Sequence, residues 1–223
     1  MIVFYVDDVI IVSKQAAEIE NLLASLKNGM DIDTGQLQKG LKKFSFTDDG
    51  AIKTFLGVSV EKTKDGYHLS QPHLIARILD AVNLNADDSS TRNIKDIPVV
   101  KPLLLRDTNG ESRQLPWNYR SVVGMLKYLS GSTRPDISIA VHQVARSSTN
   151  PKHSHEKAVM QIAHYLRSTA RFGTFYKIDL TRGIEVFVDA DFAGTWTHET
   201  ALDPNSVLSR TCYVMLLFGC PSF

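Results

Sequence analysis

The chain opens with two short apolar runs on either side of an acidic pair. Residues 2–6 and 9–12 are rich in Val, Ile and aromatic side chains, which favour strands. Asp7 and Asp8 lie between the runs, and aspartate suits a tight turn. The pattern predicts a β-hairpin with both aspartates at its turn. Two interpretations stay open: the aspartates are ordinary turn residues, or they are paired carboxylates that bind a divalent cation such as Mg²⁺.

Apolar residues recur at intervals of three or four in five later segments, a spacing that places them on one face of a helix. These segments are 14–28, 71–83, 119–130, 137–148 and 154–168. Ser13 and Asn118 precede two of them and are suitable N-caps, and Gly29 is a suitable stop. Gly124 lies in the middle of the third segment. We interpret this glycine as a place where another group approaches the helix backbone, or as a contact between two helices.

Strand-like patterns account for other segments. Residues 52–61 and 67–70 predict a second hairpin, with Asp65 and Gly66 as its two-residue turn. Gly57 lies within this pattern. It is interpreted either as a site where a backbone comes close or as a glycine that eases the twist of a strand.

The last third of the chain contains a second acidic pair. Residues 173–177 and 209–219 are predicted strands, and between them the alternating run 184–188 leads to Asp189 and Asp191. Carboxylates at the end of a strand can bind a metal ion that bridges to phosphate. The alternative is an acidic strand end followed by a turn.

Residues 84–117 lose all periodicity and are dominated by Asp, Ser, Asn, Pro and Gly. A loop of this length is unusual in a compact domain. We therefore expect a linker that crosses the surface.

Composition changes this picture only through the distribution of charge. The 223 residues are 43% hydrophobic and 22% charged, with a net charge of +1, so the totals describe an ordinary globular protein with no overall basic bias. Residues 1–91 carry a net −4, residues 92–180 a net +8 and residues 181–223 a net −3. A basic middle segment suits a surface that follows phosphates, and it is equally consistent with solvated helices.

Cysteine and histidine give no metal-site pattern. Cys212 and Cys220 match no common zinc spacing, and we expect them to be reduced residues of an intracellular protein. His153, His155 and His164 lack the spacing of a zinc-protease helix and are expected to be surface or core residues. No apolar run has the length of a membrane span, and the N-terminus lacks the basic region of a signal peptide.

Four strings resemble copia-type LTR retrotransposon polyproteins, in that family's order and over nearly the whole chain. Residues 4–8 resemble the Tyr-x-Asp-Asp hairpin of reverse transcriptases, and residues 55–57 resemble a Phe-Leu-Gly segment. Residues 119–137 resemble the signature Tyr-Arg-x-x-x-Gly, Tyr-Leu and Thr-Arg-Pro-Asp-Ile. Residues 189–194 resemble the Asp-Ala-Asp-Trp-Ala-Gly motif that opens a ribonuclease H domain, with Phe192 in place of tryptophan.

The resemblance implies an α+β fold in four parts. Residues 1–83 would be the C-terminal part of a reverse transcriptase palm, built from β-hairpins and a helix and including a primer-grip-like hairpin. Residues 84–117 would be the linker loop, and residues 118–172 a helical thumb or connection. Residues 173–223 would supply the opening strands of a truncated ribonuclease H-like domain.

The resemblance also implies site residues. Asp7, Asp8 and Asp189 would be catalytic, and these three together with Asp191 would bind Mg²⁺ in the intact enzyme. An RNA/DNA template–primer would contact five residues: Leu56, Gly57, Gly124, Lys127 and Tyr128. The intact enzyme would also bind dNTP. Family resemblance places it in a cytoplasmic virus-like particle or the nucleus, with no membrane attachment.

The family's upstream palm strand, with a third metal-binding aspartate, would precede Met1, and only the start of the ribonuclease H domain is present. We therefore expect a fragment of an RNA-directed DNA polymerase that is inactive by itself, because two-metal catalysis needs carboxylates from both palm strands. The alternative is a non-enzymatic nucleic-acid-binding remnant of a decayed element, in which residues 92–180 carry salt-dependent duplex binding.

Overall fold

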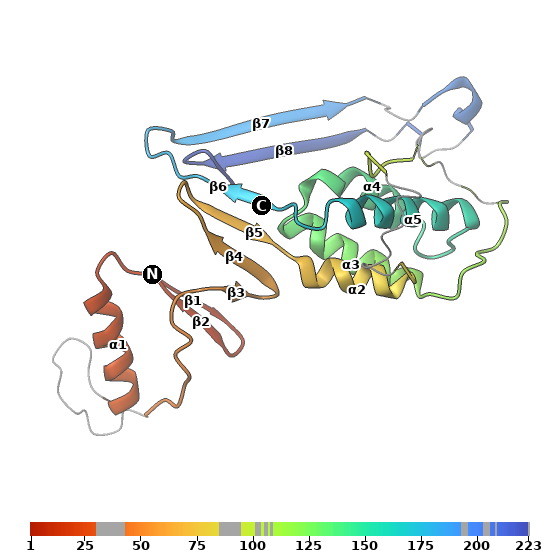
Figure 1. Cartoon of the computed structure of the whole chain (residues 1–223). Coiled ribbons are helices and arrows are strands. Elements are labelled where there is room, and N and C mark those ends of the chain that lie inside the picture. The colour runs from red at the N-terminus through yellow and green to blue at the C-terminus, as the bar shows by residue number, and fades with distance from the viewer. Residues whose placement is uncertain are drawn as a thin grey trace. The chain divides into compact units, whose positions relative to one another are not determined.

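The computed structural model describes residues 1–29, 43–84, 95–100, 104, 107, 109–192, 196–202, 206–207 and 209–222. The chain divides into two compact units, residues 1–52 and residues 53–223, and each is described by itself (Figure 1). The N-terminal part of the predicted linker, together with Ala193 and Gly194, lies outside the described residues. The mixture of helices and antiparallel sheets confirms the predicted α+β class.

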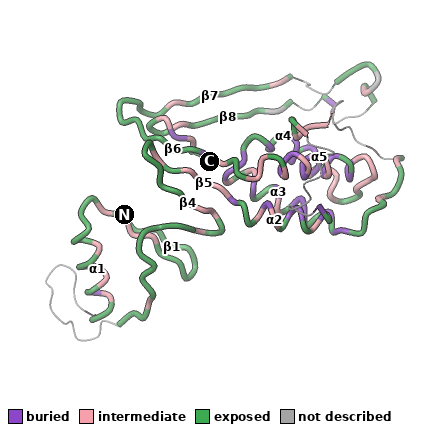
Figure 2. The backbone as a smooth tube through the Cα atoms, in the orientation of Figure 1, coloured by how far each residue is buried: buried purple, intermediate pink, exposed green. Residues whose placement is uncertain are grey.

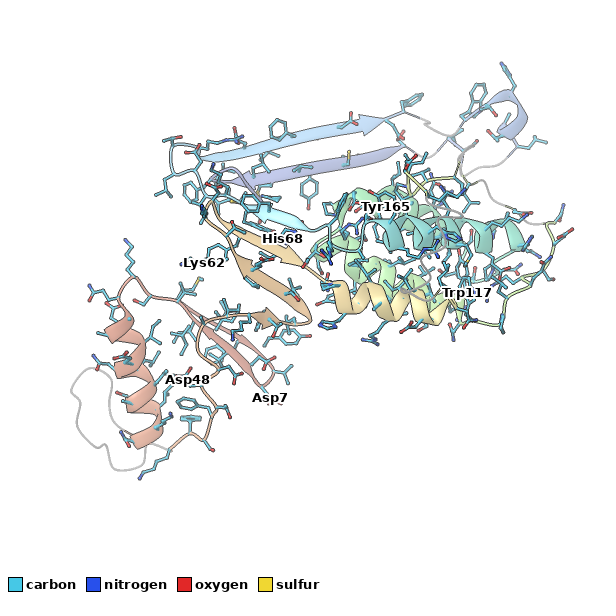
Figure 3. All side chains as sticks on the ribbon, viewed as in Figure 1. Asp7, Asp48, Lys62, His68, Trp117 and Tyr165 are labelled. Atoms are coloured by element: carbon cyan, nitrogen blue, oxygen red, sulfur yellow. The ribbon has the colours of Figure 1, made fainter. Side chains whose placement is uncertain are left out.

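The first unit contains the predicted N-terminal hairpin. Strands β1 (Ile2–Tyr5) and β2 (Asp8–Ile11) pair antiparallel, with Tyr5 opposite Asp8. The turn therefore consists of Val6 and Asp7, one residue earlier than predicted, and Asp8 belongs to a strand. Val6 has a φ of +51°, which is unusual for a β-branched residue and is required here by the two-residue turn. Asp7 lies at the tip of the hairpin (Figure 3).

Helix α1 (Ala16–Asn28) follows the hairpin. The predicted N-cap is wrong: Gln15 holds that position, and the Ser13 hydroxyl instead donates to the Glu18 carboxylate. The predicted stop is confirmed, because Gly29 adopts a left-handed φ of +68° and its N–H bonds to the last turn. Glycine reaches this conformation without steric cost.

The second unit contains a four-stranded antiparallel sheet in the order β3-β4-β5-β6. Its strands are β3 (Thr54–Phe55), β4 (Val58–Lys62), β5 (Tyr67–Ser70) and β6 (Thr174–Tyr176). The β4–β5 hairpin was predicted, but its connection spans four residues, closed by a 2.8 Å hydrogen bond from Thr63 N to Gly66 O. The β3–β4 turn is Leu56 and Gly57, with φ of +51° and +75°.

Two glycines allow β6 to pair with β5. A Cβ on Gly66 would lie 2.1 Å from the Tyr176 carbonyl oxygen, and a Cβ on Gly173 would lie 2.1 Å from the Leu69 carbonyl oxygen. Any side chain at either position would force the strands apart. Strand β6 lies at the start of residues 173–223, which were predicted to form a separate ribonuclease H-like part, yet it shares a sheet with the β4–β5 hairpin.

Helices form the core of the second unit. They are α2 (Pro72–Ala81), α3 (Tyr119–Ser132), the 3₁₀ turn η1 (Pro135–Ile137), α4 (Ser138–Ala145) and α5 (His153–Ser168). Their apolar stripes pack together, and the buried residues concentrate here (Figure 2). The five predicted helical segments are confirmed within a few residues, as is the Asn118 N-cap, whose side chain accepts from Ser121 N at 3.0 Å. None of the described helices combines the length and apolar character that crossing a membrane requires.

A third sheet, in the order β7-β8-β9, follows the helices. Strands β7 (Ile184–Asp191), β8 (Arg210–Leu217) and β9 (Cys220–Ser222) are antiparallel, and the 3₁₀ turn η2 (His198–Thr200) lies between β7 and β8. Most described side chains of β7 and β8 are exposed (Figure 2). Both cysteines are free thiols, as predicted.

The described C-terminal part of the predicted linker is fixed to α5. Glu156 is buried and accepts backbone hydrogen bonds from Gln114 N at 3.1 Å and Leu115 N at 3.0 Å. Arg113 forms a 3.3 Å ion pair with the same carboxylate and stacks over the Trp117 ring. Trp117 is only 7% exposed and lies against the helices (Figure 3). Residues 114–116 remain exposed, so this part of the segment runs along the surface and is held there at Arg113 and Trp117.

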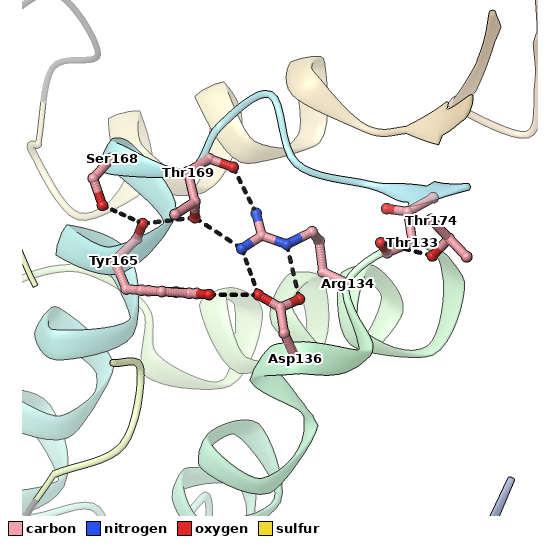
Figure 4. A network of polar contacts seen from close by, with 7 residues as sticks. All are labelled: Thr133, Arg134, Asp136, Tyr165, Ser168, Thr169 and Thr174. Carbon is pink, nitrogen blue, oxygen red and sulfur yellow. Dashed lines mark hydrogen bonds and ion pairs between the residues drawn. The ribbon is translucent and has the colours of Figure 1, made fainter. Parts of the chain in front are cut away.

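The Arg134 guanidinium is the centre of a buried polar network (Figure 4). Its side chain is 1% exposed and bonds Asp136 in a bidentate pair, with Nε to Oδ1 at 2.9 Å and Nη2 to Oδ2 at 2.7 Å. Nη1 and Nη2 also donate to the carbonyl and hydroxyl oxygens of Thr169, at 2.9 Å and 2.8 Å. The Tyr165 hydroxyl donates to Asp136 Oδ2 at 2.8 Å.

This network ties together elements that are distant in sequence. Arg134 immediately precedes η1 and Asp136 lies within it, whereas Tyr165 lies in the last turn of α5 and Thr169 follows that helix. Burial alone would raise the pKa of the Asp136 carboxyl, but hydrogen bonds from Arg134 and Tyr165 outweigh it and hold this pKa below its ordinary value. Asp136 is therefore ionised at neutral pH and balances the buried cation.

Replacing Asp136 with asparagine removes that balancing charge. Losing one partner of a buried ion pair costs about 3–5 kcal/mol. Because the Asp136 side chain is 37% exposed, solvent compensates in part, and we expect about 2 kcal/mol in the free energy of unfolding. Urea unfolding at pH 7, monitored by circular dichroism, measures this change in the free energy of unfolding.

Asp80→Asn is the matched control, because Asp80 is an exposed carboxylate on α2. We expect it to change the free energy of unfolding by less than about 0.5 kcal/mol. Equal values for the two variants would show that the Arg134–Asp136 pair does not hold the helices together.

Candidate nucleic-acid interface and carboxylate sites

A side-chain hydrogen bond joins the β3–β4 turn to helix α3. The Tyr128 hydroxyl donates a 2.6 Å hydrogen bond to the Leu56 carbonyl oxygen, across 72 positions of sequence. Tyr128 is 47% exposed, so its ring remains accessible while its hydroxyl is engaged. The structure therefore brings together two of the predicted nucleic-acid-binding segments, 56–57 and 124–128.

The outward side of α3 carries the remaining predicted residues. Val122, Val123, Leu126 and Leu129 form the buried stripe of this helix. Gly124, Lys127 and Tyr128 are all exposed. A Cβ on Gly124 would meet no atom of the described residues within 4 Å. The interpretation of Gly124 as a helix–helix contact is therefore wrong for the described part of the chain, and its open space remains available to an external group.

Gly57 lies in the β3–β4 turn, so its interpretation as a glycine that eases the twist of a strand is wrong, whereas the approach of a nucleic-acid backbone stays a prediction. No atom of the described residues lies within 4 Å of where its Cβ would be, so no neighbouring backbone within that part of the chain requires a glycine. Its φ of +75° does require one, because the turn forces two consecutive residues into the left-handed region. The same turn chemistry recurs at Phe218 and Gly219, with φ of +52° and +77°.

The N-terminal carboxylates occupy an exposed hairpin in the first unit. Asp7 lies in the turn and Asp8 at the start of β2, and both are exposed. Carboxylate oxygens suit Mg²⁺, which favours oxygen ligands and keeps several waters. The donor set fits this ion, and the two side chains supply only part of an octahedral shell.

The C-terminal carboxylates lie within a strand. Asp189 and Asp191 belong to the last three residues of β7 and, being two apart, point to the same face. Cys212 is opposite Asp189 on β8, with its Sγ 4.0 Å from Asp189 Oδ2. Among the described residues, no group of three or more His, Cys, Asp or Glu side chains could hold a metal ion.

Two important polar residues were missed at the sequence level. Arg134 belongs to the Thr-Arg-Pro-Asp-Ile string, but the resemblance does not predict its burial, and the sequence analysis assigns no role to Glu156. A signal for Glu156 was present: it precedes Val159 and Ala163 by three and seven residues, which places a carboxylate on the buried face of α5. A charged residue at such a position must be paired.

Comparison with known proteins relates the chain to transposon polyproteins. It is 30% identical over 217 residues to the retrovirus-related Pol polyprotein from transposon RE1 of Arabidopsis thaliana, covering 96% of this chain. It is 32% identical over 201 residues to the corresponding polyprotein from transposon TNT 1-94 of Nicotiana tabacum, covering 87% of this chain. The chain spans only 13% and 14% of the lengths of these two relatives.

A shorter relative extends the similarity. An uncharacterized mitochondrial protein of Arabidopsis thaliana is 25% identical over 194 residues, covering 86% of this chain and 72% of that protein. No family model and no solved structure matches. The polyprotein relatives support the expectation of a retrotransposon polyprotein segment.

Removing the Tyr128 hydroxyl tests the link between turn and helix. In Tyr128→Phe the Leu56 carbonyl loses its donor, and we expect a loss of about 0.5–1.5 kcal/mol in the free energy of unfolding. We also expect faster hydrogen exchange at the Val60 amide, which donates to Lys53 O at 2.8 Å beside this turn.

Tyr67→Phe is the control, because Tyr67 is an exposed tyrosine in the same sheet. It should leave both measurements nearly unchanged. Unchanged exchange at Val60 in Tyr128→Phe would mean that the hydroxyl contact does not hold the turn.

Proposed function

We propose that the chain is a segment of a retrotransposon RNA-directed DNA polymerase, with the start of its ribonuclease H domain. The observation that carries the proposal is the 2.6 Å contact between Tyr128 and Leu56. It joins a hairpin turn to the exposed side of α3, as a surface that holds a primer end beside a duplex would require. The polyprotein relatives support the same assignment.

The interface would bind the duplex backbone. Lys127 supplies a cation on the exposed side of α3, and Gly124 leaves space for close approach one turn away. Backbone contacts carry affinity without reading sequence, which suits an enzyme that must copy any template. The Tyr128 ring adds an exposed aromatic surface on the same side of the helix.

In the intact polyprotein, Asp7 and Asp8 would hold Mg²⁺ at the palm hairpin, and the ion would help position dNTP and the primer hydroxyl. Asp189, with Asp191 beside it, would begin the ribonuclease H site. The isolated chain is proposed to be inactive, because two exposed carboxylates at a hairpin turn compete poorly with water for Mg²⁺.

Primer extension on poly(rA)/oligo(dT) with Mg²⁺ tests the activity. We expect no template-dependent incorporation by the purified 223-residue chain, and loss of incorporation in the intact polyprotein when Asp7 is replaced by asparagine. An active reverse transcriptase in the same buffer is the positive control. Incorporation by the isolated chain that disappears in Asp7→Asn would contradict the proposed inactivity.

Binding of a fluorescent RNA–DNA duplex tests the interface separately. We expect affinity to fall with salt, and Lys127→Gln to reduce the slope of log affinity against log salt by about 1. Gly124→Leu fills space that the described residues leave open, so we expect weaker binding without loss of stability. Anisotropy titrations at several salt concentrations measure both.

Lys64→Gln is the matched control, because Lys64 is an exposed lysine in the β4–β5 connection. Equal effects of Lys127→Gln and Lys64→Gln would contradict a specific interface on α3. Duplex binding through α3, combined with an intact polyprotein that shows no polymerase activity, would favour the alternative of a non-enzymatic binding remnant, for which the basic residues 92–180 supply the charge.

A further inference from the structure

Helix α5 forms the floor of an open groove of about 520 Å³. We call it the α5 groove; its floor includes His153, Lys157, Gln161 and His164, and its sides include Lys95 and Leu115. The groove therefore lies between two parts of the segment predicted to be a linker. The proposed polymerase interface on α3 does not include it.

Both sides of the groove are held in place by hydrogen bonds from the floor. Gln161 Nε2 donates to the Ile97 carbonyl oxygen at 2.9 Å, which fixes the backbone that carries Lys95. On the other side, the Glu156 carboxylate accepts from the Leu115 backbone N–H at 3.0 Å. Both sides of the groove are therefore held in place by hydrogen bonds to the same helix, α5.

The charge inside the groove is positive. Lys95 and Lys157 both line it, and neither forms an ion pair within the described residues. Glu156 is the acidic residue of the lining, and its charge is already engaged: it receives two backbone hydrogen bonds, a 3.1 Å contact from His153 and a 3.3 Å contact from Arg113. The two lysines therefore have no anion to balance them there.

His164 adds a group that can respond to an anion. Its Nδ1 is buried and has no hydrogen-bond partner among the described residues. Burial first, and then the nearby charges of Arg167 and Lys95, hold the pKa of His164 below its ordinary value. An anion beside the ring would oppose the effect of these cations and favour the imidazolium form, which would then donate to it.

We propose that the α5 groove binds a phosphate-bearing anion between Lys95 and Lys157, with His164 as a hydrogen-bond donor to it. A tetrahedral oxyanion can accept hydrogen bonds from several donors around it. The groove also has space for an organic group attached to the phosphate, and Leu115 and Met160 would give that group apolar contacts. The site is independent of the proposed polymerase function. The phosphate could belong to a free nucleotide or to a nucleic-acid backbone.

The His164 ring reports binding directly. Inorganic phosphate is titrated into the full chain at constant pH, against chloride at equal ionic strength, while the His164 Cε1–H resonance is followed by NMR. We expect phosphate to perturb this resonance and to raise the pKa of His164, since binding and protonation are linked. Equal behaviour in phosphate and chloride would overturn the proposal.

Variants locate the site. Lys95→Gln and Lys157→Gln should each weaken phosphate binding about two- to fivefold, the range expected for one exposed ion pair. Lys62→Gln is the matched control, because Lys62 is an exposed lysine on β4 (Figure 3). Equal weakening in all three variants would overturn the site, and circular dichroism confirms that each variant is folded.

Two further probes distinguish the source of the phosphate. A 5′-mononucleotide that binds more tightly than inorganic phosphate points to a free nucleotide, and a duplex oligonucleotide that perturbs His164 when the mononucleotide does not points to a nucleic-acid backbone. Either result supports the phosphate site. The NMR titration follows His164 on α5 and does not depend on α3. If the α3 variants fail to affect duplex binding, the proposed polymerase interface is contradicted, but the test of the α5 groove still stands.

Discussion

Arg134 sets the arrangement of the helices, because a guanidinium that is 1% exposed must find partners wherever it is buried. Asp136 balances its charge, and Thr169 satisfies the remaining donors from the end of α5. Since Thr133 also bonds Gln71 at 3.0 Å and accepts from Thr174 at 3.1 Å, the same short stretch ties the bundle to the start of α2 and to β6. Residues 133–137 therefore have a structural role, because hydrogen bonds of this stretch join the elements at Gln71, Thr169 and Thr174.

The orientation of α3 follows from this constraint. Its buried stripe packs toward α2 and α4, so Gly124, Lys127 and Tyr128 necessarily lie on the outward side. Tyr128 then reaches the β3–β4 turn, whose own position depends on Leu56 and Gly57 accepting left-handed backbone conformations. The proposed interface, which is made from two remote segments, thus depends on buried contacts elsewhere in the unit. Mutations at Arg134 should consequently affect folding, whereas mutations at Lys127 should leave folding unchanged.

The helices and hairpins could be predicted because their signals are local. Apolar spacing located all five helical segments, and β-branched runs located both predicted hairpins. The errors concern interactions that local patterns do not encode. Position 57 requires glycine because of the left-handed conformation of its turn. Positions 66 and 173 require glycine because β5 and β6, which are more than a hundred residues apart in sequence, pass close together there. The anchoring of residues 114 and 115 is equally non-local, since Glu156 lies about forty residues downstream of the backbone groups that it binds. Residues of the candidate sites were identified by resemblance, and the structure adds which of them share a surface.

The burial of arginines also changes the meaning of the basic middle segment. Its net charge of +8 suggests a broad phosphate-binding surface, yet several of its cations already serve the fold. Arg134 is buried with Asp136, Arg113 is paired with Glu156 and stacked on Trp117, and Arg120 donates to the Ser148 carbonyl at 2.9 Å. Arginine suits such roles because its planar fork can satisfy several acceptors at once. Among the described cations of the segment, Lys127 on α3 and Lys95 and Lys157 in the α5 groove form no ion pair. Phosphate binding by this chain should therefore be weaker than a net charge of +8 suggests, because part of that charge is committed to the fold.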